Sequence, residues 1–168
     1  MGNLIIREAS PEDAELLIAF MKQVGGESDN LTYGPDGLPI SFEQERAFLQ
    51  MMKSEKRSVF LCAWKDGKLV GTGSLSALPR RMNHRAELSV SVVRREWGHG
   101  IGSMMMDALI TYAREHGIEI LNLEVRSDNI RAVRLYEKCG FKRIGTSPAF
   151  FKIGDKYADF ELMYLDLR

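Results

Sequence analysis

The fold of this chain is decided by the stretch Val92-Val93-Arg94-Arg95-Glu96-Trp97-Gly98-His99-Gly100-Ile101-Gly102-Ser103, which joins a predicted strand to a predicted helix. Its three glycines alternate with other residues. Glycine allows positive φ and a close backbone approach, so successive N–H groups can point at an anion while the helix N-terminus adds partial positive charge. The glycines alone fit a pyrophosphate-binding loop and a tight strand-to-helix connection equally well.

Two common phosphate-binding loops do not fit this stretch. The mononucleotide loop needs Lys followed by Ser or Thr after its last glycine, whereas Gly102 is followed by Ser103 and Met104. The dinucleotide pattern G-x-G-x-x-G needs a third glycine at position 103 or 105, and the chain has Ser103 and Met105 there. A nucleotide-binding protein of either kind is therefore disfavoured.

Hydrophobic periodicity predicts strands and helices on both sides of the glycines. Arg85 to Val93 alternates apolar and polar residues, as a half-buried strand does. Ser103 to His116 has apolar residues at helical spacing, and Gly117 is the expected stop. In total we expect strands at 4–7, 58–64, 69–78, 85–93, 118–126, 141–152 and 156–166, and helices at 10–24, 41–53, 103–116 and 128–140. The long loop at 25–39 is typical of a lid.

The composition is that of an ordinary globular enzyme. Apolar residues make up 45% of the 168 residues, and 23 Lys and Arg balance 23 Asp and Glu. This balance argues against bulk binding to nucleic acid or to a membrane surface, which needs a net basic face. Cys62 and Cys139 lie far apart without a metal-ligand spacing, so we expect free thiols and no metal site. No apolar run reaches the length of a membrane span, and we expect a cytoplasmic protein.

The glycine-rich stretch resembles the acyl-CoA loop of the GNAT superfamily of N-acetyltransferases. In that family a Gln/Arg-x-x-Gly-x-Gly/Ala segment follows a strand and opens a helix. Two registers match here, Arg95-x-x-Gly98-x-Gly100 and Trp97-x-x-Gly100-x-Gly102. The second fits the distance to the helix better, with Trp97 where many members carry Gln or Arg.

A second motif and the C-terminal segment support the resemblance. Leu123 to Asn129, followed by Leu135-Tyr136 and Cys139-Gly140-Phe141, is similar to the family's next strand and helix. Gly154 to Asp159 looks like the final hairpin of amino-acid and phosphinothricin acetyltransferases, and the form of the loop resembles ribosomal-protein acetyltransferases. The first 80 residues match only in element order.

The resemblance implies an α/β GNAT fold in one N-acetyltransferase domain spanning residues 1–168. Its sheet would be mostly antiparallel, with six to seven strands splayed in the middle and about four flanking helices. It further implies an acetyl-CoA-dependent acyltransferase in which an amine attacks directly, without a covalent enzyme intermediate. A homodimer would also fit the family, although the sequence shows no interface signature.

The family pattern places acetyl-CoA along the strand that precedes the loop and on the loop itself. A bulge in that strand could aim a backbone N–H at the thioester carbonyl. Asn129 is expected either to hold the pantetheine arm or to cap its helix, a role for which Asp128 competes. The implied contacts are Val90, Val92, Val93, Arg94, Arg95, Trp97, Gly98, His99, Gly100, Ile101, Gly102, Ser103, Asn129 and Tyr136.

Tyr136 and Glu87 are the candidate catalytic residues. The resemblance places the Tyr136 hydroxyl near the CoA sulfur, where it could protonate the leaving thiolate; the alternative is a core tyrosine on the helix face of Cys139. Glu87 is the one acid on the strand before the loop, and the resemblance places a glutamate there to take the amine's proton through water. Its alternative is a cross-strand partner for Arg81 or Arg85.

The acceptor site is the least defined part of the sequence. Tyr33 in the lid and Tyr157 in the final hairpin are predicted to form walls of this site together with Glu87, and His84 is a weaker candidate base. We expect a small-molecule amine, such as an amino acid or amine-like compound. A protein N-terminus, such as that of a ribosomal protein, is the alternative acceptor, and a CoA-binding module without turnover is the alternative function.

Overall fold

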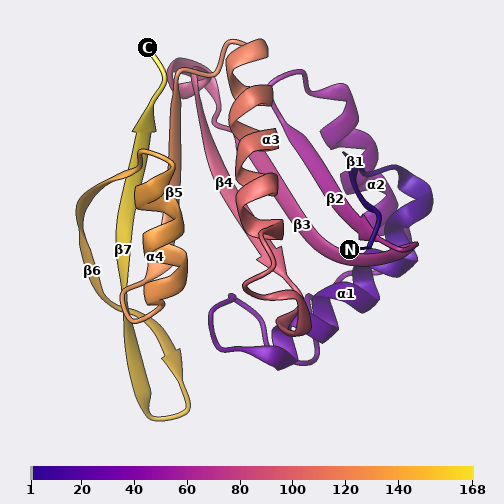
Figure 1. Ribbon diagram of the computed structural model, residues 1–168, viewed down its shortest axis with the longest axis horizontal. Coiled ribbons are helices and arrows are strands. Elements are labelled where there is room, and N and C mark those ends of the chain that lie inside the picture. Colours follow the sequence, from indigo (N-terminus) through magenta and orange to yellow (C-terminus); the bar gives the residue numbers. More distant parts are fainter. Residues whose placement is uncertain (1) are drawn as a thin grey trace.

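The computed structural model describes residues 2–168. Over these residues the seven strands form one sheet in the order β1-β2-β3-β4-β5-β7-β6, and every neighbouring pair except β4–β5 is antiparallel (Figure 1). The strands are β1 (Leu4–Glu8), β2 (Val59–Lys65), β3 (Lys68–Ala77), β4 (Arg85–Val92), β5 (Ile120–Arg126), β6 (Lys142–Ile153) and β7 (Lys156–Asp166). The predicted mostly antiparallel sheet is confirmed.

Four α-helices flank the sheet, as predicted. They are α1 (Ala14–Glu27), α2 (Phe42–Ser54), α3 (Ile101–Glu115) and α4 (Ile130–Lys138). Figure 1 shows α3 and α4 on the near side of the sheet, with α4 over the C-terminal strands. On the opposite face, α1 and α2 pack with β2 through a small cluster that includes Leu17, Leu49 and Cys62.

Several helix boundaries differ from the predicted ones; α1, for example, begins at Ala14 after a short 3-10 turn over Pro11–Asp13. The first helix was expected to stop at Val24, but α1 continues through Gly25 and Gly26 to Glu27. A Cβ at Gly25 would overlap the carbonyl oxygen of Gly34, so this glycine serves a close approach of the following loop and does not end the helix. The third helix was expected from Ser103, but α3 begins two residues earlier.

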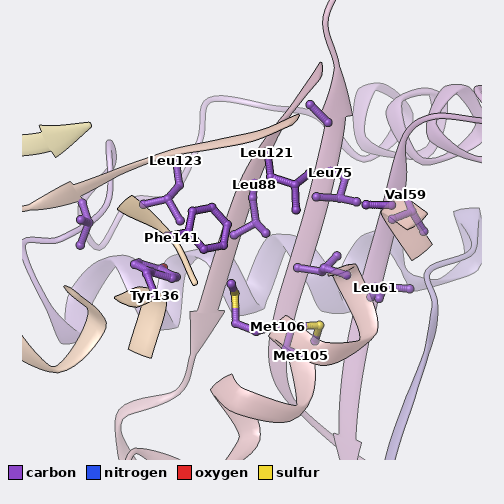
Figure 2. Close-up of a cluster of buried hydrophobic side chains, with 14 of the residues drawn as sticks. Val59, Leu61, Leu75, Leu88, Met105, Met106, Leu121, Leu123, Tyr136 and Phe141 are labelled. Carbon is purple, nitrogen blue, oxygen red and sulfur yellow. The ribbon is translucent and has the colours of Figure 1, made fainter. Parts of the chain in front are cut away.

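The main core lies between α3 and the sheet. Met105 and Met106 are fully buried and point from α3 toward β3 and β4, where Leu75 and Leu88 meet them (Figure 2). A Cβ at Gly73 of β3 would lie 2.6 Å from the Met105 Cγ, so glycine is needed there for the helix to pack this closely. This tight packing fixes α3, and with it the loop at its N-terminus, against β3 and β4.

Candidate active site

The sheet opens between β4 and β5. On one side β4 pairs with β3 over seven residue pairs, from Ala77–Ala86 to Gly71–Val92. On the other side it pairs with β5 over only three, from Arg85–Ile120 to Glu87–Asn122. Beyond Glu87 the two strands diverge (Figure 1), and a cavity of about 1190 Å³ fills the opening. The splay that the family resemblance implied is therefore present.

The glycine-rich loop forms one end of this cavity. Gly98 and Gly100 have φ of +79° and +85°, and α3 starts directly after Gly100. The N–H groups of Ile101, Gly102 and Ser103 make no hydrogen bond within residues 2–168, and Gly100 offers them no side-chain cap. Unpaired N–H groups at a helix N-terminus form a site for an anion. A pyrophosphate therefore fits this end of the cavity.

The third glycine has a different role from the first two. No atom lies within 4 Å of a Cβ built at Gly98 or at Gly100, whereas one built at Gly102 would lie 3.2 Å from the Leu135 Cδ2. Gly102 thus permits the close approach of α3 and α4. Since Leu135 and Tyr136 are neighbours on α4, this contact also helps to set where Tyr136 lies.

Side-chain hydrogen bonds hold the glycine-rich loop in place. Glu96 Oε2 accepts from Lys65 Nζ at 2.8 Å and lies 3.1 Å from His99 Nδ1. The hydrogen bond from Lys65, followed by that from His99, lowers the pKa of Glu96. The Trp97 indole N–H donates to the carbonyl of Val92 at 2.8 Å. These bonds tie the loop to β2 and to the end of β4.

Most of the predicted cofactor contacts line the cavity. These are Val90, Val92, Trp97, Gly98, Gly100, Ile101, Gly102, Ser103, Asn129 and Tyr136. Val93 is buried and donates its N–H to Val70, and the structure does not bring Arg95 or His99 into the lining. Arg94 lies at a smaller neighbouring hollow, with its guanidinium 5.3 Å from the Trp97 ring.

The structure decides two open details of the predicted cofactor site. The β3–β4 ladder runs without a register shift along β4, so the bulge considered for this strand is absent from it. Of the two residues considered as the cap of α4, Asn129 takes this role, with its Oδ1 accepting from the Ala132 N–H at 3.4 Å. Asp128 instead pairs with Arg126 at 2.8 Å, because the guanidinium of Arg126 binds both oxygens of its carboxylate.

Tyr136 lies where the opening meets the core. Its ring contacts Phe141 at a centroid distance of 6.0 Å, and Leu123 of β5 lies beside the pair (Figure 2). Its hydroxyl makes no hydrogen bond within residues 2–168, although the side chain also lines the cavity. Burial raises the pKa of Tyr136 to about 12, so its hydroxyl stays protonated at neutral pH. It can therefore donate a proton to a group in the cavity.

Two carboxylates lie on the cavity face of the diverging strands. Glu87 is on β4, and Glu124 is on β5 two residues beyond Asn122, the partner of Glu87 in the ladder. Burial, followed by the charge of Glu87, raises the pKa of Glu124. Neither Arg81 nor Arg85 forms a salt bridge with Glu87, so the cross-strand ion pair considered for Glu87 is absent from the described chain.

Glu124 was not identified from the sequence as a site residue. The signal was present, because Glu124 stands between Leu123 and Val125 in an alternating strand and therefore points away from the core. Without the position of β5 beside β4, nothing in the sequence shows that this exposed acid faces the same cavity as Glu87.

The acceptor-site candidates separate in the structure. Tyr33 lines the cavity from the segment between α1 and α2, and burial raises its pKa. Tyr157 is 64% exposed and lies outside the lining, as does His84. Instead the C-terminal hairpin contributes Phe150 and Phe151, which the sequence analysis did not single out.

The remaining reactive groups of the described residues show neither a metal centre nor an activated thiol. Residues 2–168 contain no group of three or more His, Cys, Asp or Glu side chains able to hold a metal ion. Cys62 is buried, which raises its pKa to about 12, and burial also raises the pKa of Cys139. No helix within these residues is both long and apolar enough to span a bilayer.

Comparison with known proteins identifies similar sequences and folds. The model of the acetyltransferase (GNAT) family matches residues 28–141. An N-alpha-acetyltransferase RimI of Mycobacterium tuberculosis is 32% identical over 116 residues, which cover 68% of this chain and 67% of the relative. An L-methionine sulfoximine/L-methionine sulfone acetyltransferase of Pseudomonas aeruginosa is 23% identical over 96% of this chain and 94% of its own length.

Solved structures agree over almost the whole chain. The crystal structure of a GNAT-family acetyltransferase from Streptococcus pneumoniae has a TM-score of 0.94 and 33% identity, covering 98% of this chain and 99% of that one. The putative acetyltransferase yncA of Salmonella typhimurium, solved with its cofactor acetyl-CoA, has a TM-score of 0.86 and 20% identity, covering 98% of this chain and 94% of that one. At 20% identity, the similarity to yncA shows a shared fold only.

Proposed function

Because the chain belongs to the GNAT family of acetyltransferases, we propose that it moves the acetyl group of acetyl-CoA directly onto the primary amine of a small molecule. The observation that carries this proposal is the cavity between β4 and β5, which a helix N-terminus, the Tyr136 side chain and two carboxylates line together. In this proposal residues 1–168 act as one N-acetyltransferase domain.

Acetyl-CoA would supply a thioester, whose carbonyl carbon an amine can attack, and a pyrophosphate. The free N–H groups of Ile101, Gly102 and Ser103 suit the pyrophosphate. The edge of β4 at Val90 and Val92, which β5 leaves unpaired, suits the amide groups of the pantetheine arm, which would bind as an added strand. Asn129 lines the same cavity and keeps its side-chain N–H₂ group available while its Oδ1 caps α4.

The protein's own residues can manage both proton transfers. The acceptor arrives as an ammonium and must lose a proton before its nitrogen can form the new N–C bond. Glu124 is the proposed base, because its raised pKa brings its proton affinity nearer to that of the amine. As the C–S bond breaks, the protonated hydroxyl of Tyr136 donates to the sulfur. Cys139 packs on α4 and takes no covalent part.

The walls of the cavity favour a small acceptor. Residues 30–33 line it on one side and the β6–β7 hairpin lines it on the other, so an acceptor must fit between them. The curated relatives include both an N-alpha-acetyltransferase and an amino-acid-derivative acetyltransferase, so a peptide N-terminus is the second candidate. A protein that binds CoA without turnover is the third.

The test is release of free thiol from acetyl-CoA over a panel of amino acids, polyamines and peptides with free N-termini. We expect release with at least one small amine to exceed release with every peptide by about tenfold or more, a difference of about 1.4 kcal/mol in transition-state binding. A preference for peptides would support the second candidate. Tight CoA binding with no thiol release for any amine would instead support the module without turnover.

A further inference from the structure

The side of the cavity opposite α3 carries two opposite charges on one strand face, Arg85 and Glu87. On β4, Arg85 and Glu87 lie on the same face of the strand because they are two residues apart, and both line the cavity. Within residues 2–168 neither of them belongs to a salt bridge, whereas two other charged residues of the lining, Arg126 and Glu96, pair with Asp128 and Lys65.

The guanidinium of Arg85 is oriented toward the opening. Arg85 is opposite Ile120 in the β4–β5 ladder, yet its Nε donates to the Oδ1 of Asn122 at 3.1 Å. Asn122 is the ladder partner of Glu87, so the Arg85 side chain leans along the strand to the level of Glu87, where the sheet begins to split. The bond through Nε holds the planar group and leaves its two terminal nitrogens free, the arrangement that binds a carboxylate in bidentate fashion.

The carboxylates that would take the proton of the amine lie at neighbouring positions of the two diverging strands. Glu87 is on the same strand face as Arg85, and Glu124 follows Asn122 on β5. The cavity thus offers an oriented cation and two acids at the point where the strands separate. A ligand that pairs with the guanidinium and with the acids at the same time must carry an anion and an ammonium a short distance apart.

The wall next to these charges is apolar and is shaped by an irregular stretch of β6. The register with β7 shifts between Ser147 and Phe151, and Ala149 has a φ of +52°, held by its N–H bond to Asp159 Oδ1 at 2.8 Å. This bulge places Phe150 and Phe151 together against Phe160, with ring centroids 4.3 to 5.7 Å apart. With Ile144 and Leu162 they line the cavity as an apolar surface.

We propose that Arg85, positioned by Asn122, binds the carboxylate of the acceptor, so that the natural acceptor is a zwitterionic amino acid with an apolar side chain. Its ammonium lies at Glu87 and Glu124, and its side chain lies against Phe150 and Phe151. This inference rests on the proposed function and narrows it. A polyamine, which has no carboxylate, and a peptide N-terminus, whose α-carboxylate is an amide, would both leave Arg85 unpaired.

The experiment compares L-leucine, L-methionine and L-phenylalanine with their carboxamides as acceptors for wild type and for Arg85→Gln. Each pair shares its side chain and amine, and only the carboxylate is lost. Because a carboxamide lowers the pKa of the neighbouring amine, the readout is the change in the acid-to-amide ratio of kcat/KM between the two proteins. Arg81→Gln, an exposed arginine outside the cavity lining, is the matched control for charge.

We expect Arg85→Gln to lower kcat/KM for the acids at least tenfold, mainly through KM, and to leave the amides within about threefold of wild type. Arg85→Lys should recover part of the loss, and Arg81→Gln should change neither series. An equal fall for acids and amides would overturn the proposal, as would a wild-type enzyme that turns over the amides but not the acids. Thermal midpoints of the variants identify any loss due to misfolding.

A binding measurement separates this inference from the proposed function. If wild type releases no thiol with any amine, the proposed function fails. Calorimetric titration of the same acids and amides into the protein with CoA then decides the inference alone. Binding of acids that Arg85→Gln weakens at least tenfold would support it. Absence of binding, or acid binding that Arg85→Gln leaves intact, would reject it.

Discussion

The two edges of strand β4 differ in how far they are hydrogen-bonded to the neighbouring strands. Toward β3 the strand is paired along its whole length, and Gly71 and Gly73 of β3 let α3 settle onto that closed side with its fully buried methionines. Toward β5 it is paired for only three residues, and a cavity takes the place of the remaining ladder. The same strand therefore contributes stability on one edge and chemistry on the other.

The two edges of β4 differ in how many of the polar groups near them have hydrogen-bond or salt-bridge partners. On the closed edge the backbone groups are paired and the side chains are buried. On the open edge the N–H groups at the start of α3 and the Tyr136 hydroxyl make no hydrogen bond within the described chain, and Arg85 and Glu87 belong to no salt bridge there, although Arg85 donates to Asn122. Buried or half-buried polar groups without partners are costly, and they persist where a ligand completes them. Substitutions on the two edges should consequently show different effects.

The largest effect is expected on the open edge, from Tyr136→Phe. In the proposed reaction the Tyr136 hydroxyl protonates the departing thiolate in the transition state, so its loss should lower kcat about 10²-fold. The Kd for CoA and the thermal midpoint should change little. Tyr112→Phe is the matched control, because it removes a hydroxyl that bonds Lys56 and Ser58 carbonyls away from the cavity. Unchanged kcat in Tyr136→Phe would make Tyr136 a core residue only.

A substitution on the closed edge should instead lower the free energy of unfolding, and Gly73→Ala tests this. The added methyl group would lie 2.6 Å from the Met105 Cγ and 3.0 Å from the Leu109 Cδ1, so both must move within a packed core. Overpacking of this kind typically costs about 1–3 kcal/mol of unfolding free energy, measured by denaturant titration. Gly145→Ala, in a strand with no atom within 4 Å of its new methyl, should be nearly neutral. Equal effects of the two would contradict the packing argument.

Gly100→Val returns to the open edge and combines strain with obstruction. Gly100 has a φ of +85°, which a β-branched residue adopts poorly, and its side chain would project beside the free N–H groups. We expect CoA binding to weaken at least tenfold, or about 1.4 kcal/mol, by calorimetry. Gly67→Val imposes similar strain at a φ of +79° in the β2–β3 turn, away from the cavity. If Gly67→Val weakens CoA binding as much, the loss reflects instability alone.

The sequence predicted the closed edge better than the open one. Alternation and glycine stops are local signals, so the order of strands and helices was predictable, and the family resemblance added the splay. Glycine is more ambiguous, because the same residue ends a helix at Gly117, continues one at Gly25 and spaces two helices at Gly102.

The acceptor side depends on contacts between distant segments. Arg85 meets Asn122, and Phe150 and Phe151 reach the cavity through a bulge that Asp159 holds. None of these pairings is encoded in local periodicity. Tyr157 was a reasonable aromatic to choose from the hairpin sequence, but the register of β6 with β7 brings other aromatic residues to the cavity.

The smallest expected effect distinguishes the two carboxylates of the open edge. The charge of Glu87 contributes to the raised pKa of Glu124, so Glu87→Gln should lower the pKa of Glu124. If Glu124 is the base, the acid limb of the kcat/KM profile then moves to lower pH. The ratio of Glu87→Gln to wild type rises above one in acid and approaches one at neutral pH. If Glu87 is the base, this ratio instead falls below one in acid and recovers toward the amine's own pKa.

Stability provides the control for this prediction. Glu87 has no salt bridge in the described chain and its charge repels that of Glu124, so Glu87→Gln should leave the thermal midpoint at neutral pH unchanged or raise it slightly. A carboxyl group with a raised pKa in the folded state adds stability below its unfolded pKa, and that stability is lost as pH rises through the folded pKa. Glu124→Gln should accordingly leave the midpoint at neutral pH unchanged or raise it, while lowering kcat/KM most in acid. A flat ratio for both variants would assign deprotonation of the amine to bulk water, because neither acid would then be needed on the open edge.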